Sequence, residues 1–135
     1  MSERVPPGLR RLVRDRAGHR CEYCLLHEDD ALLPHEPDHI VPIKHRGGTQ
    51  LDNLAWTCFL CNRSKGTDLA SLDPKTGRLA RLFHPRLDAW ESHFRLEPGG
   101  RIVAFTPEGR VTEYLLKFNI HENVEMRRLL MRARW

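Results

Sequence analysis

The sequence predicts a small single-domain α+β protein in which a hairpin, a loop and a helix are closed by one metal site. Two Cys-x-x-Cys pairs, Cys21 with Cys24 and Cys58 with Cys61, bracket short extended and turn-like segments, and helical patterns flank them. The 135 residues suffice for one domain with a modest core and are too few for two ordinary ones. We therefore expect one domain over residues 1–135, with its core at about 18–68 and a C-terminal extension at about 69–135.

The first element that we expect is a basic helix over residues 7–17. A proline is tolerated in its first turn, and Gly18 stands just past its end. Its apolar residues recur at helical spacing: Leu9, Leu12, Val13 and Ala17. The helix packs on the core through these residues, and its arginines either face water or contact DNA.

The stretch between the two cysteine pairs predicts an extended strand over residues 34–43 and a turn at residues 46–49. Asp52 is then expected to cap a short helical turn over residues 53–55. Residues 61–65 predict the start of another helix, which Gly66 ends. The resulting order is hairpin, loop and helix.

The C-terminal extension predicts a hairpin-and-helix arrangement. A tight turn at residues 73–77 precedes a strand at 78–83, and a turn at 98–100 precedes a strand at 102–105. Thr106 as N-cap and Pro107 at the first helical position predict a helix to about Lys117. A last helix is expected over roughly residues 124–132.

The four cysteines have the spacing of a structural zinc site, in which thiolates complete a closed tetrahedron. Such sites contribute apparent binding energies on the order of 10 to 16 kcal/mol, so loss of one cysteine should unfold the middle of the chain. Four buried free cysteines, a four-cysteine iron site and a redox-active pair are the alternatives.

Inside the loop that the cysteines close, Asp38 and His39 are adjacent, and Asn62 follows the last cysteine. Carboxylate and amide oxygens are hard ligands that suit Mg²⁺ or Mn²⁺, whereas zinc prefers the sulfurs. His39 is then available as a general base at neutral pH. Neighbouring residues of a regular strand point to opposite faces, so Asp38 and His39 share one site only if the strand bends or ends there.

Taken in order, these residues resemble the HNH endonucleases, whose ββα-metal or His-Me finger core has a small bacterial branch with four zinc-binding cysteines. The matching elements are Cys21 and Cys24, Asp38-His39-Ile40, Gly47-Gly48, Asn53-Leu54, Cys58 to Asn62 and Lys65-Gly66. Similarity also extends to Leu82–Arg86, Trp90, His93-Phe94 and Thr106–Arg110. In the family's three-letter signature, this chain is a His-Asn-Asn variant.

The resemblance implies metal-dependent hydrolysis of phosphodiester bonds in DNA, giving a 5′-phosphate product. It implies that His39 is the general base, that Asp38 and Asn62 bind the catalytic divalent ion, Mg²⁺ or Mn²⁺, and that Asn53 ties the loop together and orients the histidine. Zn²⁺ on the four cysteines would be structural.

Several residues around these motifs are candidates for accessory roles. Lys44, Arg46, Arg63 and Lys65, with His45, could neutralise DNA phosphates or only keep the surface solvated. His35 and Glu36 could contact the metal or only form the entry to the strand. A second group could form another DNA-facing patch or belong to the core: His84, Arg86, Trp90 and His93.

The composition and charge of the chain limit the classes of binding partner that we expect. Lys and Arg number 22 against 18 acidic residues, a net charge of +4 that mildly favours polyanions. Residues 1–8 lack an apolar run and no stretch is long enough to span a membrane, so we expect a cytoplasmic monomer or homodimer that acts on DNA, with RNA not excluded. The alternatives are a catalytically inactive zinc-stabilised nucleic-acid binding module and a zinc-bearing protein-interaction domain, which would show no salt-dependent DNA affinity.

Overall fold

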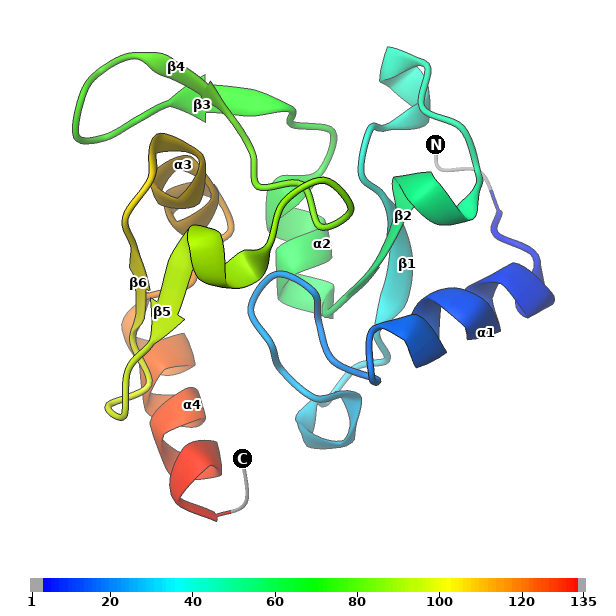
Figure 1. Cartoon of the computed structure of the whole chain (residues 1–135). Coiled ribbons are helices and arrows are strands. Elements are labelled where there is room, and N and C mark those ends of the chain that lie inside the picture. Colours follow the sequence, from blue (N-terminus) through cyan, green and yellow to red (C-terminus); the bar gives the residue numbers. More distant parts are fainter. Residues whose placement is uncertain (1–3, 134–135) are drawn as a thin grey trace. The chain divides into compact units, whose positions relative to one another are not determined.

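The computed structural model describes residues 4–133, which form two compact units (Figure 1). The first unit comprises the described residues up to Asp68 together with His84–Leu87, and the second comprises Leu69–Phe83 and the chain from Asp88 onward. Both units combine helices with short antiparallel strand pairs, which confirms the α+β class. Each is described by itself below.

In the first unit, helix α1 (Pro7–Arg16) packs on the strand pair β1 (Glu36–His39) and β2 (Leu54–Thr57), as Figure 1 shows in blue and cyan-green. Val13 on the helix is buried against Leu54 and Trp56 of β2. Val5, Leu9 and Ala17 extend this contact. The observed helix lies within the range predicted from its apolar spacing.

The arginines of α1 bind the unit's own groups. Arg14 donates to both carboxylate oxygens of Glu28 at 2.7–3.1 Å. Glu28 is the first residue of the 3₁₀ turn η1 (Glu28–Asp30). Arg16 donates to the carbonyl oxygens of Leu51 and Leu54 at 2.8 and 2.5 Å. Arg10 lies over the ring of Trp56, 5.1 Å from its centroid. These three guanidinium groups therefore hold the helix against the sheet.

The central hairpin differs from the prediction at its second strand. Residues 54–57 form β2, and only Leu51–Asn53 adopt a 3₁₀ turn (η3), so the helical turn expected over residues 53–55 is wrong. Every residue of β2 is buried, and Asp38 pairs with Ala55 while His39 pairs with Leu54. Burial on both faces favours the strand, because the sheet supplies the hydrogen bonds that a short helical turn would leave unmade.

Strand β1 is shorter than the predicted span of residues 34–43, because the chain bends at Ile40 and then enters the 3₁₀ turn η2 (Ile43–His45). Helix α2 (Phe59–Lys65) follows β2 directly, with Cys58 as its N-cap. Gly66 ends the helix at φ +53°, a left-handed value that glycine adopts without a Cβ clash. This confirms the predicted end of the helix.

The second unit contains two hairpins, β3 (Ala70–Leu72) with β4 (Leu79–Arg81) and β5 (Phe94–Leu96) with β6 (Ile102–Ala104). The predicted strands at 78–83 and 102–105 contain β4 and β6, whereas β3 and β5 were missed. A 3₁₀ turn, η4 (Trp90–Ser92), precedes β5.

Two helices complete the second unit, α3 (Pro107–Leu115) and α4 (His121–Ala133). The side chain of Thr106 accepts a hydrogen bond from the backbone N–H of Gly109 at 2.9 Å, which confirms it as the N-cap. The core holds tilted and edge-on aromatic rings, among them Phe83, Phe94 and Phe118. Among residues 4–133, no helix is long and apolar enough to cross a membrane.

Candidate functional site

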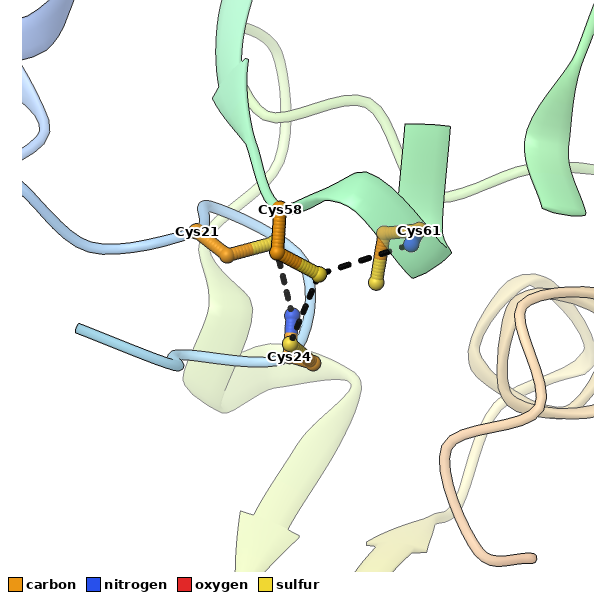
Figure 2. Close-up of side chains that lie close together, drawn as sticks. All are labelled: Cys21, Cys24, Cys58 and Cys61. Carbon is orange, nitrogen blue, oxygen red and sulfur yellow. Dashed lines mark hydrogen bonds between the residues drawn. The ribbon is translucent and has the colours of Figure 1, made fainter. Parts of the chain in front are cut away.

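The four cysteines converge on one point of the first unit (Figure 2). Cys21 and Cys24 come from the loop after α1, and Cys58 and Cys61 come from the junction of β2 and α2. All four are buried, and their sulfur atoms lie within 4.8 Å of one another, with Cys24 Sγ and Cys58 Sγ 3.6 Å apart. Thiolates on one tetrahedral zinc ion would be about 3.8 Å apart, so this cluster could hold a zinc ion.

Backbone geometry fixes the direction of each sulfur. The N–H of Cys24 points at Cys21 Sγ at 3.5 Å, and the N–H of Cys61 points at Cys58 Sγ at 3.4 Å. The first turn closes through Cys21 N–H to the Leu26 carbonyl at 2.9 Å, with Leu25 at φ +71°. Each Cys-x-x-Cys pair thus forms a tight turn whose amide N–H groups favour thiolates.

Charge within the cluster also favours a cation. Hydrogen bonds with Cys21 and its neighbours lower the pKa of Cys58, whereas they raise the pKa of Cys24 and of Cys61 well above the ordinary range, as does burial. Without an ion, Cys24 and Cys61 therefore favour the thiol form. A divalent ion would allow all four to ionise, because its charge offsets their mutual repulsion.

The loop between η2 and β2 is held by the side chain of Asn53. Its Oδ1 accepts from the Val41 N–H at 2.9 Å, and its Nδ2 donates to the carbonyls of Val41 at 2.9 Å and Gly48 at 2.8 Å. Gly47 lies so close that a Cβ there would be 1.7 Å from the Val41 carbonyl oxygen. The buried amide thus ties the loop together across twelve residues of sequence, in the place where the resemblance implies a structural asparagine.

His39 is the last residue of β1 and is buried. Its Nε2 lies 2.9 Å from the hydroxyl oxygen of Thr49, in the loop that Asn53 holds. The strand ends at His39 and the chain bends at Ile40, which meets the geometric condition for two adjacent side chains to serve one site.

Asp38 is paired with Lys65 inside the protein. Their side chains are 9% and 1% exposed, and Lys65 Nζ lies 2.9 Å from Asp38 Oδ2 and donates to the His39 carbonyl at 3.1 Å. Asp38 Oδ2 is therefore already in contact with a cation, the ammonium of Lys65. Burial raises the pKa of Asp38, although the ammonium of Lys65 acts to lower it. A metal ion at this carboxylate would have to share it with Lys65.

One pocket joins the three residues predicted to carry the chemistry. Asp38, His39 and Asn62 all line a cavity of about 320 Å³ in the first unit, with Lys44 at its rim. Asn62 is half-buried on α2, and its backbone N–H bonds the Cys58 carbonyl at 3.0 Å. The first turn of α2 therefore brings the amide to the same pocket as the end of β1.

The residues predicted to contact phosphate occupy different environments. Lys44, Arg46 and Arg63 are exposed, and Arg46 has φ +72° at the end of η2. Lys65 is 2% exposed and bound to Asp38, so its ammonium does not reach the surface, unlike the other three.

Most of the other residues that the sequence suggested as metal or DNA contacts instead contact groups within the protein. His35 is buried, with Nε2 2.8 Å from the Leu26 carbonyl, while Glu36 is exposed at the pocket. Arg86 pairs with Glu22 in the first unit. In the second unit, Trp90 packs on Phe94 with ring centroids 5.1 Å apart, and His93 bonds Thr106 at 2.5 Å.

Two site residues were not anticipated in their observed roles, Thr49 as the partner of His39 and Lys65 as the partner of Asp38. Thr49 follows the two glycines of the predicted turn, so its position on that turn was the available signal. Lys65 shows no such signal, because nothing in its neighbours indicates burial.

No curated protein and no solved structure matches the chain at a significant level. A family model does match, over the segment that contains both cysteine pairs, the Asp38-His39 pair and Asn62. An HNH domain indicates a nuclease or nucleic-acid binding function. Residues 21–68 match the family model described as HNH endonuclease, which confirms the resemblance expected from the sequence.

Proposed function

We propose that this protein is a metal-dependent endonuclease that hydrolyses phosphodiester bonds in DNA, with β1, β2 and α2 as a ββα-metal core. The observation that supports this most directly is the single pocket lined by Asp38, His39 and Asn62 within the segment that matches the HNH model. A carboxylate, an imidazole and an amide at one pocket are the groups that hydrolysis with one divalent ion requires.

In this proposal His39 takes the proton from the attacking water. His39 Nε2 lies 2.9 Å from Thr49 Oγ1, and we propose the tautomer in which Nε2–H donates to this oxygen, so that the lone pair on Nδ1 accepts that proton. Thr49 and the Asn53-bound loop hold the ring in one orientation, which limits the cost of aligning base, water and phosphate.

Asp38 and Asn62 would hold the catalytic ion, Mg²⁺ or Mn²⁺, through oxygen ligands. When bound, this ion would supply charge stabilisation at the phosphate and the leaving oxygen. The ion would share the buried carboxylate of Asp38 with Lys65, which keeps that carboxylate in place. The four cysteines would hold a structural Zn²⁺, which would fix the start of α2 and hence Asn62.

The exposed basic residues Lys44, Arg46 and Arg63 are proposed to bind backbone phosphates on either side of the scissile bond. The reduced thiols that the zinc cluster requires are consistent with the cytoplasm as the proposed compartment. A monomer would nick one strand per encounter, whereas a homodimer could cut both, and sedimentation with and without DNA separates these states.

The deciding experiment is cleavage of supercoiled plasmid by the zinc-loaded chain with Mg²⁺ or Mn²⁺. We expect relaxed or linear product from the wild type, a loss of at least about a hundredfold in His39→Ala, and wild-type rates in His121→Ala. His121 is an exposed histidine at the start of α4 and serves as the matched control. No cleavage with any divalent ion, or equal cleavage by His39→Ala, would contradict the proposal.

A second candidate function is a catalytically inactive, zinc-stabilised nucleic-acid binding module. The ion pair of Lys65 with Asp38 favours it, because an ammonium already neutralises the carboxylate that would bind the catalytic ion. This module would bind DNA with a salt-dependent affinity and would show no Asp38-dependent binding of Mn²⁺. Titration of Mn²⁺ against the wild type and Asp38→Asn, followed by electron paramagnetic resonance, separates the two functions.

A further inference from the structure

A second pocket of about 410 Å³ lies on the first unit beside the one that contains Asp38 and His39. The two pockets share two lining residues, Glu36 and Asn62. A group bound in the second pocket would therefore be next to whatever occupies the first. Its volume is in the range of small-molecule sites, about 300–1,000 Å³.

The wall of the second pocket combines an exposed aromatic ring with a cation. Phe59, at the first position of α2, is 41% exposed, and the guanidinium carbon of Arg63 lies 5.2 Å from its ring centroid. Leu33 and Pro34 supply further apolar surface, and both are exposed. A large aromatic side chain left in water beside an arginine is the kind of platform on which nucleobases stack.

Polar groups lie next to this platform. The amide of Asn62, the carboxylate of Glu36 and the guanidinium of Arg63 all line the pocket, and together they offer both donors and acceptors to the edge of a base. Thr57 is buried at the base of the pocket, and its hydroxyl donates to the Glu36 carbonyl at 2.8 Å. That bond fixes the start of β1 relative to β2 and hence the position of Glu36.

We infer that this second pocket is a base-binding subsite, in which Phe59 stacks on an unpaired base of the nucleotide whose phosphate lies at His39. The inference rests on the proposed nuclease function and names its substrate class, namely DNA that is single-stranded or locally unpaired at the cut. A base within an intact duplex is stacked on both faces, so it could reach the ring of Phe59 only after leaving the helix. Arg63 contributes both to stacking and to the attraction of the backbone.

The test measures affinity separately from cleavage. In a His39→Ala background, fluorescence anisotropy gives the dissociation constants of a single-stranded oligonucleotide and of the matching duplex over a series of salt concentrations. We expect Phe59→Ala to weaken single-strand binding at least about fivefold and to leave duplex binding within about twofold of its starting value. Zinc content and circular dichroism report whether each variant folds.

Leu60 provides the matched control, because it is the next residue of α2, is 48% exposed and does not line the pocket. Leu60→Ala should leave both affinities unchanged. Phe59→Leu keeps the apolar bulk without the aromatic face and should behave like Phe59→Ala, whereas Phe59→Trp should restore single-strand binding. These two variants keep the test decisive if Phe59→Ala does not fold.

Several outcomes would overturn the subsite. Equal losses for single strand and duplex, an equal effect of Leu60→Ala, or an unchanged single-strand affinity of Phe59→Leu would each do so. A change in sedimentation mass on Phe59→Ala with unaltered affinities would identify this face as a self-association surface instead. If neither oligonucleotide binds with salt-sensitive affinity, the proposed function itself fails, whereas intact His39-dependent cleavage with no effect of Phe59 rejects the subsite alone.

Discussion

At the scale of single residues, the buried pair of Asp38 and Lys65 shows how the site is held before any ion is bound. Two charged groups that are almost fully removed from water are compatible with a stable fold only if they are paired with each other. Lys65 also donates to the His39 carbonyl, so one ammonium holds the side chain of Asp38 and the backbone of His39 at the end of β1. Its role is therefore to position Asp38 and His39.

Removal of that ammonium should be costly. Lys65→Met is expected to lower the free energy of unfolding by about 3–5 kcal/mol, because it leaves the carboxylate buried without its counter-charge. Urea unfolding of the zinc-loaded proteins measures this loss. The double variant with Asp38→Asn should recover part of it, and a Lys65→Met protein as stable as the wild type would show that the pair contributes nothing.

The hydroxyl of Thr49 gives a second prediction at this scale. Thr49→Val removes the partner of His39 Nε2 while it keeps the shape of the side chain, and we expect kcat for plasmid cleavage to fall up to about a hundredfold as the ring loses its orientation. The pH dependence of cleavage should also change, since the valine no longer selects the tautomer. Thr49→Ser should restore both, and an unaltered rate in Thr49→Val would remove Thr49 from the site.

At the scale of elements, the turn between η2 and β2 depends on a glycine and an asparagine that are in contact. Asn53 occupies the space directly beside Gly47, so there is no room for a Cβ at that position. The loop thus has one compact arrangement, and that arrangement carries Thr49 to His39.

Alanine substitution of the two neighbouring glycines separates the effect of a steric clash from the effect of any change in this part of the sequence. Gly47→Ala should displace the loop and reduce cleavage, because its Cβ would overlap backbone atoms of Val41. Gly48→Ala is the matched control, since its nearest neighbour is the flexible side chain of Gln50 at 3.3 Å. Nuclear magnetic resonance shifts of His39 should move in the first variant only, and equal shifts in both would argue against the steric role.

The hairpin of β3 and β4 is joined to α3 by an ion pair whose contribution depends on pH. Arg110 donates to both carboxylate oxygens of Asp73 at 2.9 Å and holds the pKa of that carboxyl well below its usual range. The stabilisation is therefore fully present above about pH 4, the pKa of an unfolded aspartate, and is lost as the pH falls through the folded value.

Thermal unfolding tests this dependence. At pH 6 the wild type should be more stable than Asp73→Asn, and the difference should shrink as the pH falls below about 4. Glu91→Gln, at an exposed carboxyl of the second unit, should show no such pH-dependent difference. A constant difference between the wild type and Asp73→Asn over this range would exclude the ion pair as its source.

Helices could be predicted from the sequence more completely than strands. The ends of α1, α2 and α3 are marked by local residues, namely Pro7, Gly66, Thr106 and Pro107. Strands β2, β3 and β5 have three or four residues each, and their stability comes from partners that the local pattern does not contain. A window as short as Leu54–Thr57 fits either a helical turn or a strand until its burial is known.

The same distinction applies to the candidate site. Spacing within a motif was enough to predict the cysteine cluster, whose four sulfurs converge. Asp38, His39 and Asn62 line one pocket, and their roles there remain predictions. Burial was not predictable, because it depends on how α2 packs on β1. Lys65 was therefore expected at the surface and lies inside.

At the scale of the whole molecule, the cysteine cluster and the aromatic core belong to different compact units. Chelation should therefore remove the hydrogen-exchange protection of β1, β2 and α2, because thiolates without a cation repel one another. Protection of β5 and β6 should persist, since that hairpin packs through Phe94 and Ile102 in the second unit. Simultaneous loss in both units would show that they unfold as one cooperative domain, as the single-domain prediction requires.

Three arginines of α1 have a consequence for how DNA would sense this protein. Arg10, Arg14 and Arg16 contact an indole face, a carboxylate and carbonyl oxygens, so each would have to leave a partner within the protein before it could bind a phosphate. These side chains would then release few counterions from DNA, and α1 should contribute little to the slope of affinity against ionic strength. Substrate recognition would then depend on the residues at the cut more than on this basic helix.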